Sequence, residues 1–282
     1  AKKINGEIIN ADSMQVYKQL RILSARPDPK KYQKIKHHLY GFHDARKSFS
    51  TGDWLKLVNQ KIKEVHKKNK KPILVGGTGL YFKALTDGLV KIPKLPMKFR
   101  NQIRNLHKKL GQKKFYKKLL KLDSSSKRII NPKDSQRSIR AYEVKKFTGK
   151  SLFKFLKETK TNFNKNVFKK IFINIPRELL NKKIEKRVEK MFSDGAIDEV
   201  KKFYEMKVNE EMSSNKIIGI KEIRDYLHGK TTLIKAKELI AQKTRQYAKR
   251  QFTWARGHMK SWEMIYSINI NDLLKKTINK IS

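Results

Sequence analysis

The first part of the chain contains two apolar patterns of different period. Residues 7–11 form a short extended apolar run that ends at Asp12 and Ser13, polar residues that are typical of the exit from a strand into a helix. Further on, residues 50–53 offer helix-capping side chains. They are followed by apolar residues at helical spacing, namely Trp54, Val58, Ile62 and Val65. The pattern predicts a strand, a helix entered at Asp12, and then an amphipathic helix of about four turns.

A strand, a glycine-rich turn and a helix follow one another between residues 72 and 85. Residues 72–75 are continuously apolar, residues 76–79 read Gly-Gly-Thr-Gly, and residues 80–85 return to a helical pattern. This order is the βα unit of a parallel sheet, in which ligands bind at the carboxyl ends of the strands. We therefore expect an α/β fold in which Asp12 and Thr78 lie at the same edge of the sheet.

The middle of the chain differs from both ends. Two prolines in residues 91–96 predict a hinge. Residues 96–164 are rich in Lys and Arg and helical in pattern, which predicts a basic helical insertion. Strand character returns at residues 168–175, and the C-terminal third is mostly helical. The predicted domains are therefore a core of residues 1–95 and 165–282 and an insertion of residues 96–164.

The net charge of the chain supports nucleic-acid binding only weakly. The chain has 282 residues and a formal net charge of +44, and a field of that sign attracts nucleic acid. Lysine far outnumbers arginine, however, as drift in an AT-rich genome would also produce. The chain has no cysteine, no signal-peptide pattern at its start and no apolar run that could span a bilayer. We expect a cytoplasmic protein without membrane attachment.

Each motif has a plain structural explanation when it is taken alone. Asp12 could cap a helix, and the Gly-Gly-Thr-Gly segment could be a tight turn instead of a phosphate site. A helix at residues 178–192 has a buried stripe with Arg187 at its edge, where an arginine usually extends into solvent. Residues 244–256 mix cations with aromatic rings, which suits either nucleic acid or an ordinary core face with solvated lysines.

The motifs in combination resemble one family, the tRNA dimethylallyltransferases, also called tRNA isopentenyltransferases. The resemblance runs in family order over nearly the whole chain, and several ordered motifs are more specific than any single one. They are DSMQVYK from Asp12, Ala25-Arg26-Pro27, His37-His38-Leu39, GGTGLYFKAL from Gly76, Asn131-Pro132 with Asp134 and Gln136-Arg137, residues 180–195, Gly219 with Lys221-Glu222, and TRQYAKRQFTWAR from Thr244.

The resemblance implies a P-loop kinase-like parallel sheet with a helical insertion that grips the anticodon stem of tRNA. It also implies dimethylallyl diphosphate as donor and Mg²⁺ as cofactor, with no metal ligand assigned in this chain. Asp12 matches the general base, Arg187 a diphosphate-binding arginine, and Thr78 a threonine between base and diphosphate. The expected tRNA contacts are Ser13, Met14, Gln15, Arg100, Gln136, Arg137, Ser138, Ile139, Arg140, Arg245, Lys249 and Arg250.

Three positions depart from the family pattern. Family members begin with a strand and a phosphate-binding loop ahead of the Asp-Ser motif, whereas the only glycine before Asp12 is Gly6. We expect that about 25 residues are missing and that the chain as given binds RNA better than it turns over donor. Leu23 stands where glycine is usual, and Lys183 replaces an arginine one turn before Arg187.

Two other functions fit parts of the pattern. A small-molecule P-loop kinase or adenylate prenyltransferase would share the core but has less use for the basic insertion. A related RNA-binding protein without activity would keep the grip on RNA and lack the phosphate loop. The expected function remains transfer of a dimethylallyl group to N6 of the adenosine on the 3′ side of the anticodon, by a monomeric enzyme.

Overall fold

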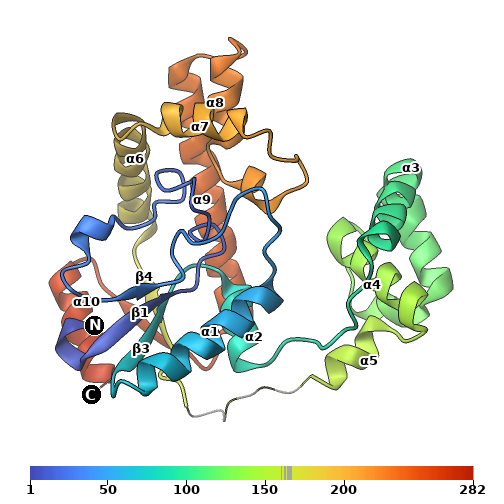
Figure 1. Cartoon of the computed structure of the whole chain (residues 1–282), viewed down its shortest axis with the longest axis horizontal. Helices are drawn as coiled ribbons and strands as arrows, with labels where there is room; N and C mark the ends of the chain where they lie inside the picture. The colour runs from blue at the N-terminus through green and yellow to red at the C-terminus, as the bar shows by residue number, and fades with distance from the viewer. Residues whose placement is uncertain (160, 162, 164–166, 282) are drawn as a thin grey trace. The chain divides into compact units, whose positions relative to one another are not determined.

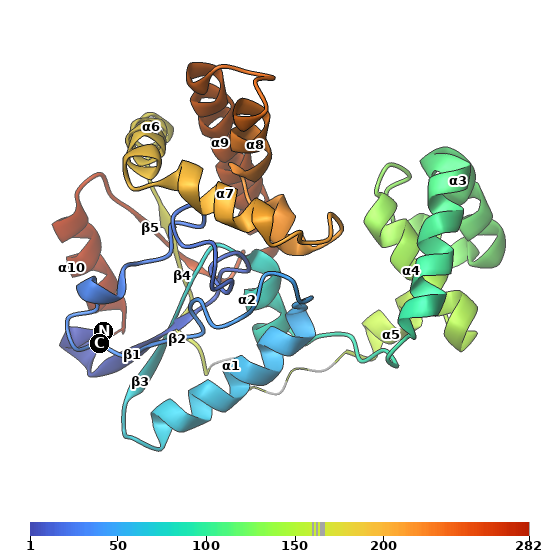
Figure 2. The same cartoon turned by 45° about the horizontal axis from the view of Figure 1, so that its top comes forward.

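The computed structural model describes residues 1–159, 161, 163 and 167–281. The chain divides into two compact units, residues 1–84 with 164–282 and residues 85–163. The predicted insertion begins at residue 96 and the second of these units begins at residue 85, and residue 164, the predicted end of the insertion, is outside the described residues. Figures 1 and 2 show the elements of each unit. The two units are considered one at a time below.

The larger unit is an α/β structure whose described strands are all in parallel pairs. One sheet has the order β2-β1-β3, and a second sheet pairs β4 with β5. The strands are β1 (Gly6–Asn10), β2 (His37–His38), β3 (Lys71–Val75), β4 (Ile171–Asn174) and β5 (Glu263–Tyr266). Its α-helices are α1 (Thr51–His66), α2 (Gly79–Thr86), α6 (Arg177–Ser193), α7 (Ala196–Glu205), α8 (Ile220–Leu227), α9 (Leu233–His258) and α10 (Ile270–Ile281). Short 3₁₀ turns cover Lys2–Ile4, Pro29–Lys31 and Ser213–Lys216.

Helix α1 forms as the sequence predicts. Ser50 caps it, and the Ser50 and Asp53 side chains and backbones form a reciprocal capping box. The four predicted apolar positions, Trp54, Val58, Ile62 and Val65, are all buried. The helix packs along β1 and β3, as Figure 2 shows. Trp54 also donates its indole N–H to the Asn10 carbonyl at 2.9 Å, which ties the helix to the end of β1.

The helix expected at Asp12 is not present, and that prediction was wrong. Residues 13–25 form turns after β1, with a single bridge between Tyr17 and His43. The Arg26 guanidinium donates hydrogen bonds to the carbonyls of Tyr17 and Lys18 at 2.9 and 3.2 Å. These tertiary contacts occupy backbone acceptors that a helix would use, and they outweigh the local cap signal of Asp12.

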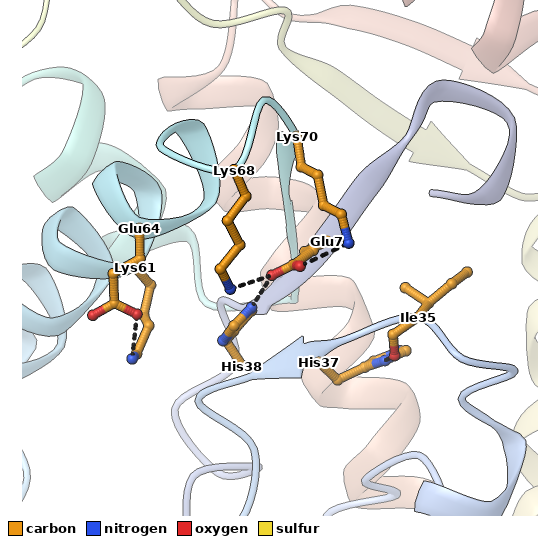
Figure 3. Close-up of polar contacts among 8 residues, drawn as sticks. All are labelled: Glu7, Ile35, His37, His38, Lys61, Glu64, Lys68 and Lys70. Carbon is orange, nitrogen blue, oxygen red and sulfur yellow. Dashed lines mark hydrogen bonds and ion pairs between the residues drawn. The ribbon is translucent and has the colours of Figure 1, made fainter.

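A buried carboxylate joins three elements at the other end of β1. Glu7 is 2% exposed, and its Oε2 lies 2.7 Å from Nε2 of His38 on β2. Its Oε1 accepts from Lys70 at 3.1 Å, and the Lys68 ammonium lies 3.9 Å from Oε2 (Figure 3). Burial raises the pKa of Glu7, but the hydrogen bonds from His38 and Lys70 and the nearby lysine charges outweigh it, so the pKa is lowered.

The smaller unit is helical, and no strand occurs among its described residues. It contains α3 (Met97–Leu122), a 3₁₀ turn (Ser124–Arg128), α4 (Ser135–Thr148) and α5 (Leu152–Lys157). Gly111, at φ 68°, breaks α3 into two helical parts. Phe115, Leu119 and Ala141 are fully buried where α3 packs on α4. The unit therefore has its own hydrophobic core.

Candidate active site

The site begins where two parallel strands end. Asp12 follows β1, and the segment Gly76–Gly79 links β3 to α2. The Ala11 N–H donates to the Val75 carbonyl at 2.8 Å, and the Thr78 N–H donates to the Ala11 carbonyl at 3.2 Å. The Ser13 N–H donates to the Thr78 hydroxyl oxygen at 2.9 Å. Asp12 and Thr78 thus lie at the same edge of the sheet, as expected.

The Asp12 carboxylate is held by backbone donors. Its Oδ1 accepts from the N–H groups of Met14 and Gln15 at 2.8 and 3.3 Å, which are the hydrogen bonds of a cap although no helix follows. Burial raises the pKa of Asp12, and the N–H groups of Met14, Gln15 and Gly77 together with the Arg187 charge oppose this rise without cancelling it. A fixed carboxylate with a raised pKa is a suitable proton acceptor near neutral pH.

The glycines of the Gly76–Gly79 segment have no space for side chains. A Cβ at Gly76 would lie 2.1 Å from the Ala11 carbonyl carbon, and one at Gly77 would lie 2.2 Å from Nε2 of Gln251. At Gly79 a Cβ would lie 2.3 Å from the indole ring of Trp254. The glycines therefore let this loop pass between the end of β1 and helix α9, a close approach that no other residue permits.

Arg187 is on α6, between the buried residues Ile184 and Val188. Its side chain keeps an exposed surface. Burial by the surrounding protein lowers the pKa of the guanidinium, and the Asp12 charge raises it. Arg187 is thus an exposed arginine whose charge acts on Asp12. A cation within electrostatic reach of this carboxylate can meet a departing anion.

The residues directly after Asp12 are tied into the fold. Thr78 donates its hydroxyl to the Ser13 hydroxyl oxygen at 3.2 Å, and the Met14 side chain packs against the hydrophobic core. The Gln15 amide nitrogen donates to the carbonyls of Ser24 and Ala25 at 3.1 and 3.2 Å. Because that nitrogen is engaged twice, the amide oxygen is the group of Gln15 that is suited to a ligand.

Two tyrosines near Asp12 were not predicted as site residues. Burial raises the pKa of Tyr40 to about 12, and the Tyr32 and Asp12 charges add to that rise. Burial also raises the pKa of Tyr247 on α9, again with a contribution from Asp12. Both phenols therefore stay protonated at neutral pH. Tyr40 directly follows the His-His-Leu motif and Tyr247 lies within the TRQYAKRQFTWAR motif, so their positions in these motifs were the sequence signals available.

Comparison with known proteins agrees with this geometry. A sequence model of the family described as IPP transferase matches residues 15–258. This chain belongs to the IPP transferase family. A tRNA dimethylallyltransferase of Pelagibacter ubique is 56% identical over 276 residues, which cover 98% of this chain and 88% of the relative.

Solved structures of IPP transferases have the same fold. The full-length tRNA isopentenylpyrophosphate transferase of Bacillus halodurans has a TM-score of 0.70 and 32% identity, with 100% of this chain and 88% of that one covered. A eukaryotic dimethylallyltransferase studied while acting on tRNA has a TM-score of 0.78 and 27% identity, with 94% and 68% covered. The predicted α/β fold class is thereby confirmed.

In this IPP transferase the predicted cations of α9 lie in different environments. The Arg245 guanidinium lies 3.5 Å from Oε1 of Glu185 on α6, so part of its charge is compensated. Lys249 and Arg250 are exposed. The Arg250 guanidinium lies 5.6 Å from the Tyr247 ring centroid. Lys249 and Arg250 therefore have the accessibility that RNA contact requires.

The predicted residues of the helical unit fall into two groups. Arg100 and Arg140 both pair with the buried Glu143, at 3.4 and 3.1 Å, and keep partial exposure. Gln136 and Arg137 are exposed on the first turn of α4, where Asp134 provides the cap.

Ser138 is fully buried and donates its hydroxyl to the Asp134 carbonyl at 2.7 Å, and Ile139 packs against the core of the unit. The sequence motif could not separate these two residues from their neighbours, because a helix turns successive side chains to different faces. In the structure the Ser138 side chain is buried and the Ile139 side chain is partly buried, and their contact with tRNA stays a prediction.

Proposed function

We propose that this chain transfers a dimethylallyl group from dimethylallyl diphosphate to N6 of the adenosine on the 3′ side of the anticodon in tRNA. The observation that carries the proposal is the Asp12 carboxylate, which is fixed beside Thr78 and subject to the Arg187 charge. Support also comes from the relatives, one of which is named tRNA dimethylallyltransferase and another described as acting on tRNA.

The chemistry needs a proton acceptor on one side and an anion site on the other. The exocyclic amine of adenine is a weak nucleophile because its lone pair is delocalised into the ring. As the new C–N bond forms at the allylic carbon, the C–O bond to the diphosphate breaks and the amine must lose a proton. Asp12 takes that proton and Arg187 meets the charge of the leaving diphosphate, to which the Thr78 hydroxyl can donate once it turns away from the Ser13 hydroxyl.

The tRNA is bound through its phosphates, and the target adenine is unstacked from the anticodon loop. Exposed Gln136, Arg137, Lys249 and Arg250 and partly exposed Arg100, Arg140 and Arg245 supply the phosphate contacts. Ser13, Met14 and the Gln15 amide oxygen lie beside Asp12, where the target base must arrive. A stacked adenine reaches such a site only after leaving the stack, and the phosphate contacts offset that unstacking.

Mg²⁺ is proposed to arrive with the donor. Among residues 1–159, 161, 163 and 167–281, no group of three or more His, Cys, Asp or Glu side chains could hold a metal ion. Mg²⁺ is commonly bound through substrate phosphates with few protein ligands, which fits this finding. In the same described residues no helix has the length and apolarity of a membrane span. A monomeric state and a cytoplasmic location stay predictions.

The proposal is tested by transfer of labelled dimethylallyl to an anticodon stem-loop. The chain is assayed alone and with a family phosphate-binding loop added before Ala1. Label on the adenosine next to the anticodon is the expected result. RNA binding without any transfer in either form would instead support the non-enzymatic alternative. Transfer to a free nucleotide in preference to the stem-loop would support the small-molecule alternative.

The role of Asp12 is tested with Asp12→Asn, which keeps an oxygen for the Met14 and Gln15 N–H groups and removes the proton acceptor. The transfer rate is expected to fall by roughly 10²–10⁴-fold with RNA affinity unchanged. The matched control is Asp198→Asn, at an aspartate that is 72% exposed on α7 and expected to leave activity unchanged. Unchanged turnover of Asp12→Asn would remove Asp12 from the mechanism.

A further inference from the structure

Helix α9 contacts the Gly76–Gly79 segment, here called the glycine loop, through two residues one turn apart. The Gln251 side-chain amide donates to the Gly77 carbonyl at 2.8 Å. Three residues on, the Trp254 ring packs against Gly79 so closely that a Cβ there would lie 2.3 Å from the ring. The loop is thus fixed by a hydrogen bond at one point and by an aromatic ring at the next.

Gly77 lies between Gln251 and Asp12, so fixing Gly77 also restricts the Asp12 carboxylate. Its carbonyl accepts from the Gln251 amide, and its backbone N–H is among the groups that lower the pKa of Asp12. A Cβ at Gly77 would lie 2.2 Å from the Gln251 amide nitrogen and 3.7 Å from Oδ2 of Asp12, which places Gly77 between these two groups. The adjacent Thr78 hydroxyl accepts from the Ser13 N–H at 2.9 Å. The loop therefore contacts the Asp12 turn on both sides.

We propose that Gln251 is a positioning residue for the transfer reaction, whose amide fixes Gly77 so that the Asp12 carboxylate stays aligned to accept the proton. The inference rests on the proposed function of Asp12. An amide suits this task because it supplies an N–H to the Gly77 carbonyl without adding a charge beside Asp12.

The test is Gln251→Met, which keeps the length of the side chain and removes the hydrogen-bond donor. We expect the single-turnover transfer rate to fall about tenfold or more, the size of effect expected for one lost hydrogen bond, while the KM for the stem-loop changes less than about twofold. The control is Gln242→Met, on an exposed position of the same helix. It is expected to retain the wild-type rate and KM.

The pH profile separates positioning from simple packing. A hydrogen bond from the Gly77 N–H favours the charged form of Asp12 and lowers its pKa, so loosening it raises that pKa. The acidic limb of the rate profile is therefore expected to move to higher pH in Gln251→Met. Of the titratable groups linked to Asp12, Arg187 acts on its pKa, whereas the tyrosines at 40, 81 and 247 have pKa values that Asp12 helps to raise. The tyrosines stay neutral and Arg187 stays charged over this range, so the limb reports Asp12.

Two results would overturn the inference. A folded Gln251→Met with wild-type rate and pH profile would show that Gln251 only packs against the loop. A higher KM with an unchanged profile would make it an RNA contact. If Gln251→Met does not fold, Gln251→Leu also removes the amide donor without adding a charge beside Asp12, and the same outcomes decide. Absence of transfer by the wild-type protein even with the phosphate-binding loop added would refute the proposed function itself, which distinguishes the two failures.

Discussion

Replacement of Glu7 by glutamine tests whether the buried carboxylate on β1 stabilises the sheet. Glu7→Gln keeps the size and shape of the side chain and removes its charge. The carboxylate is 2% exposed and is the common partner of His38 on β2 and of Lys68 and Lys70 in the turn between α1 and β3 (Figure 3). One change therefore weakens contacts between three segments of the larger unit.

The expected loss follows from the burial of each partner. Breaking a fully buried pair costs about 3–5 kcal/mol, and a charge-assisted hydrogen bond contributes about 1.5–3 kcal/mol. His38 is 8% exposed, but Lys68 and Lys70 are 45% and 39% exposed, so solvent screens both lysines. The glutamine oxygen still accepts one hydrogen bond. We therefore expect a loss of about 2 kcal/mol, which corresponds to a drop in Tm of roughly 4–8 °C.

The measurement is urea unfolding with a thermal melt, and Figure 3 also contains the matched control. Glu64 on α1 pairs with Lys61 at 2.7 Å on a solvent-exposed face. Glu64→Gln makes the same chemical change where solvent screens the charge, so its unfolding midpoint is expected to stay at the wild-type value.

The effect of Glu7→Gln also has a defined pH dependence. The folded-state pKa of Glu7 is lowered, so the carboxylate contributes stability that is present above its unfolded pKa of about 4.3 and is lost as the pH falls through the folded value. The difference between wild type and variant is thus expected to be full at pH 7 and to shrink below about pH 4. Equal midpoints at pH 7, or a difference that persists undiminished in acid, would refute the reasoning.

Three further predictions concern the site and the RNA grip. Arg187→Ala should lower the transfer rate and weaken donor binding with stem-loop affinity retained; an effect confined to RNA affinity in filter binding would contradict its assignment. Arg137 is 70% exposed, so Arg137→Gln should reduce the slope of log K for RNA binding against log salt concentration by about 1. Arg46→Gln, at a 61% exposed arginine of the other unit, should leave that slope unchanged. A flat salt dependence of the wild type would mean that the charge of +44 reflects composition alone. Gly76→Ala should destabilise the protein by about 3 kcal/mol or more in urea unfolding, because its Cβ would meet the Ala11 backbone at 2.1 Å, and a wild-type midpoint would show that the loop can move away.

Much of the fold follows from local patterns that the sequence states directly. Helix α1 carries its own cap and its own apolar stripe, and the strand, glycine turn and helix at β3 and α2 are contiguous in the chain. The parallel arrangement then requires Asp12 and Thr78 to share an edge, since the carboxyl ends of parallel strands lie together. The family also followed from sequence, because its motifs occur in order along nearly the whole chain.

Tertiary structure decided what depends on residues far apart in the sequence. Gln251 and Gly77 are 174 positions apart, and nothing local to either predicts their hydrogen bond. The expected helix after Asp12 is replaced by turns because the Arg26 side chain donates hydrogen bonds to the backbone carbonyls of Tyr17 and Lys18. Ser138 lies in the same motif as exposed Arg137 but is buried, because the helix faces the core at that residue. Periodicity and capping are local properties, whereas side-chain partners are fixed only when distant segments pack.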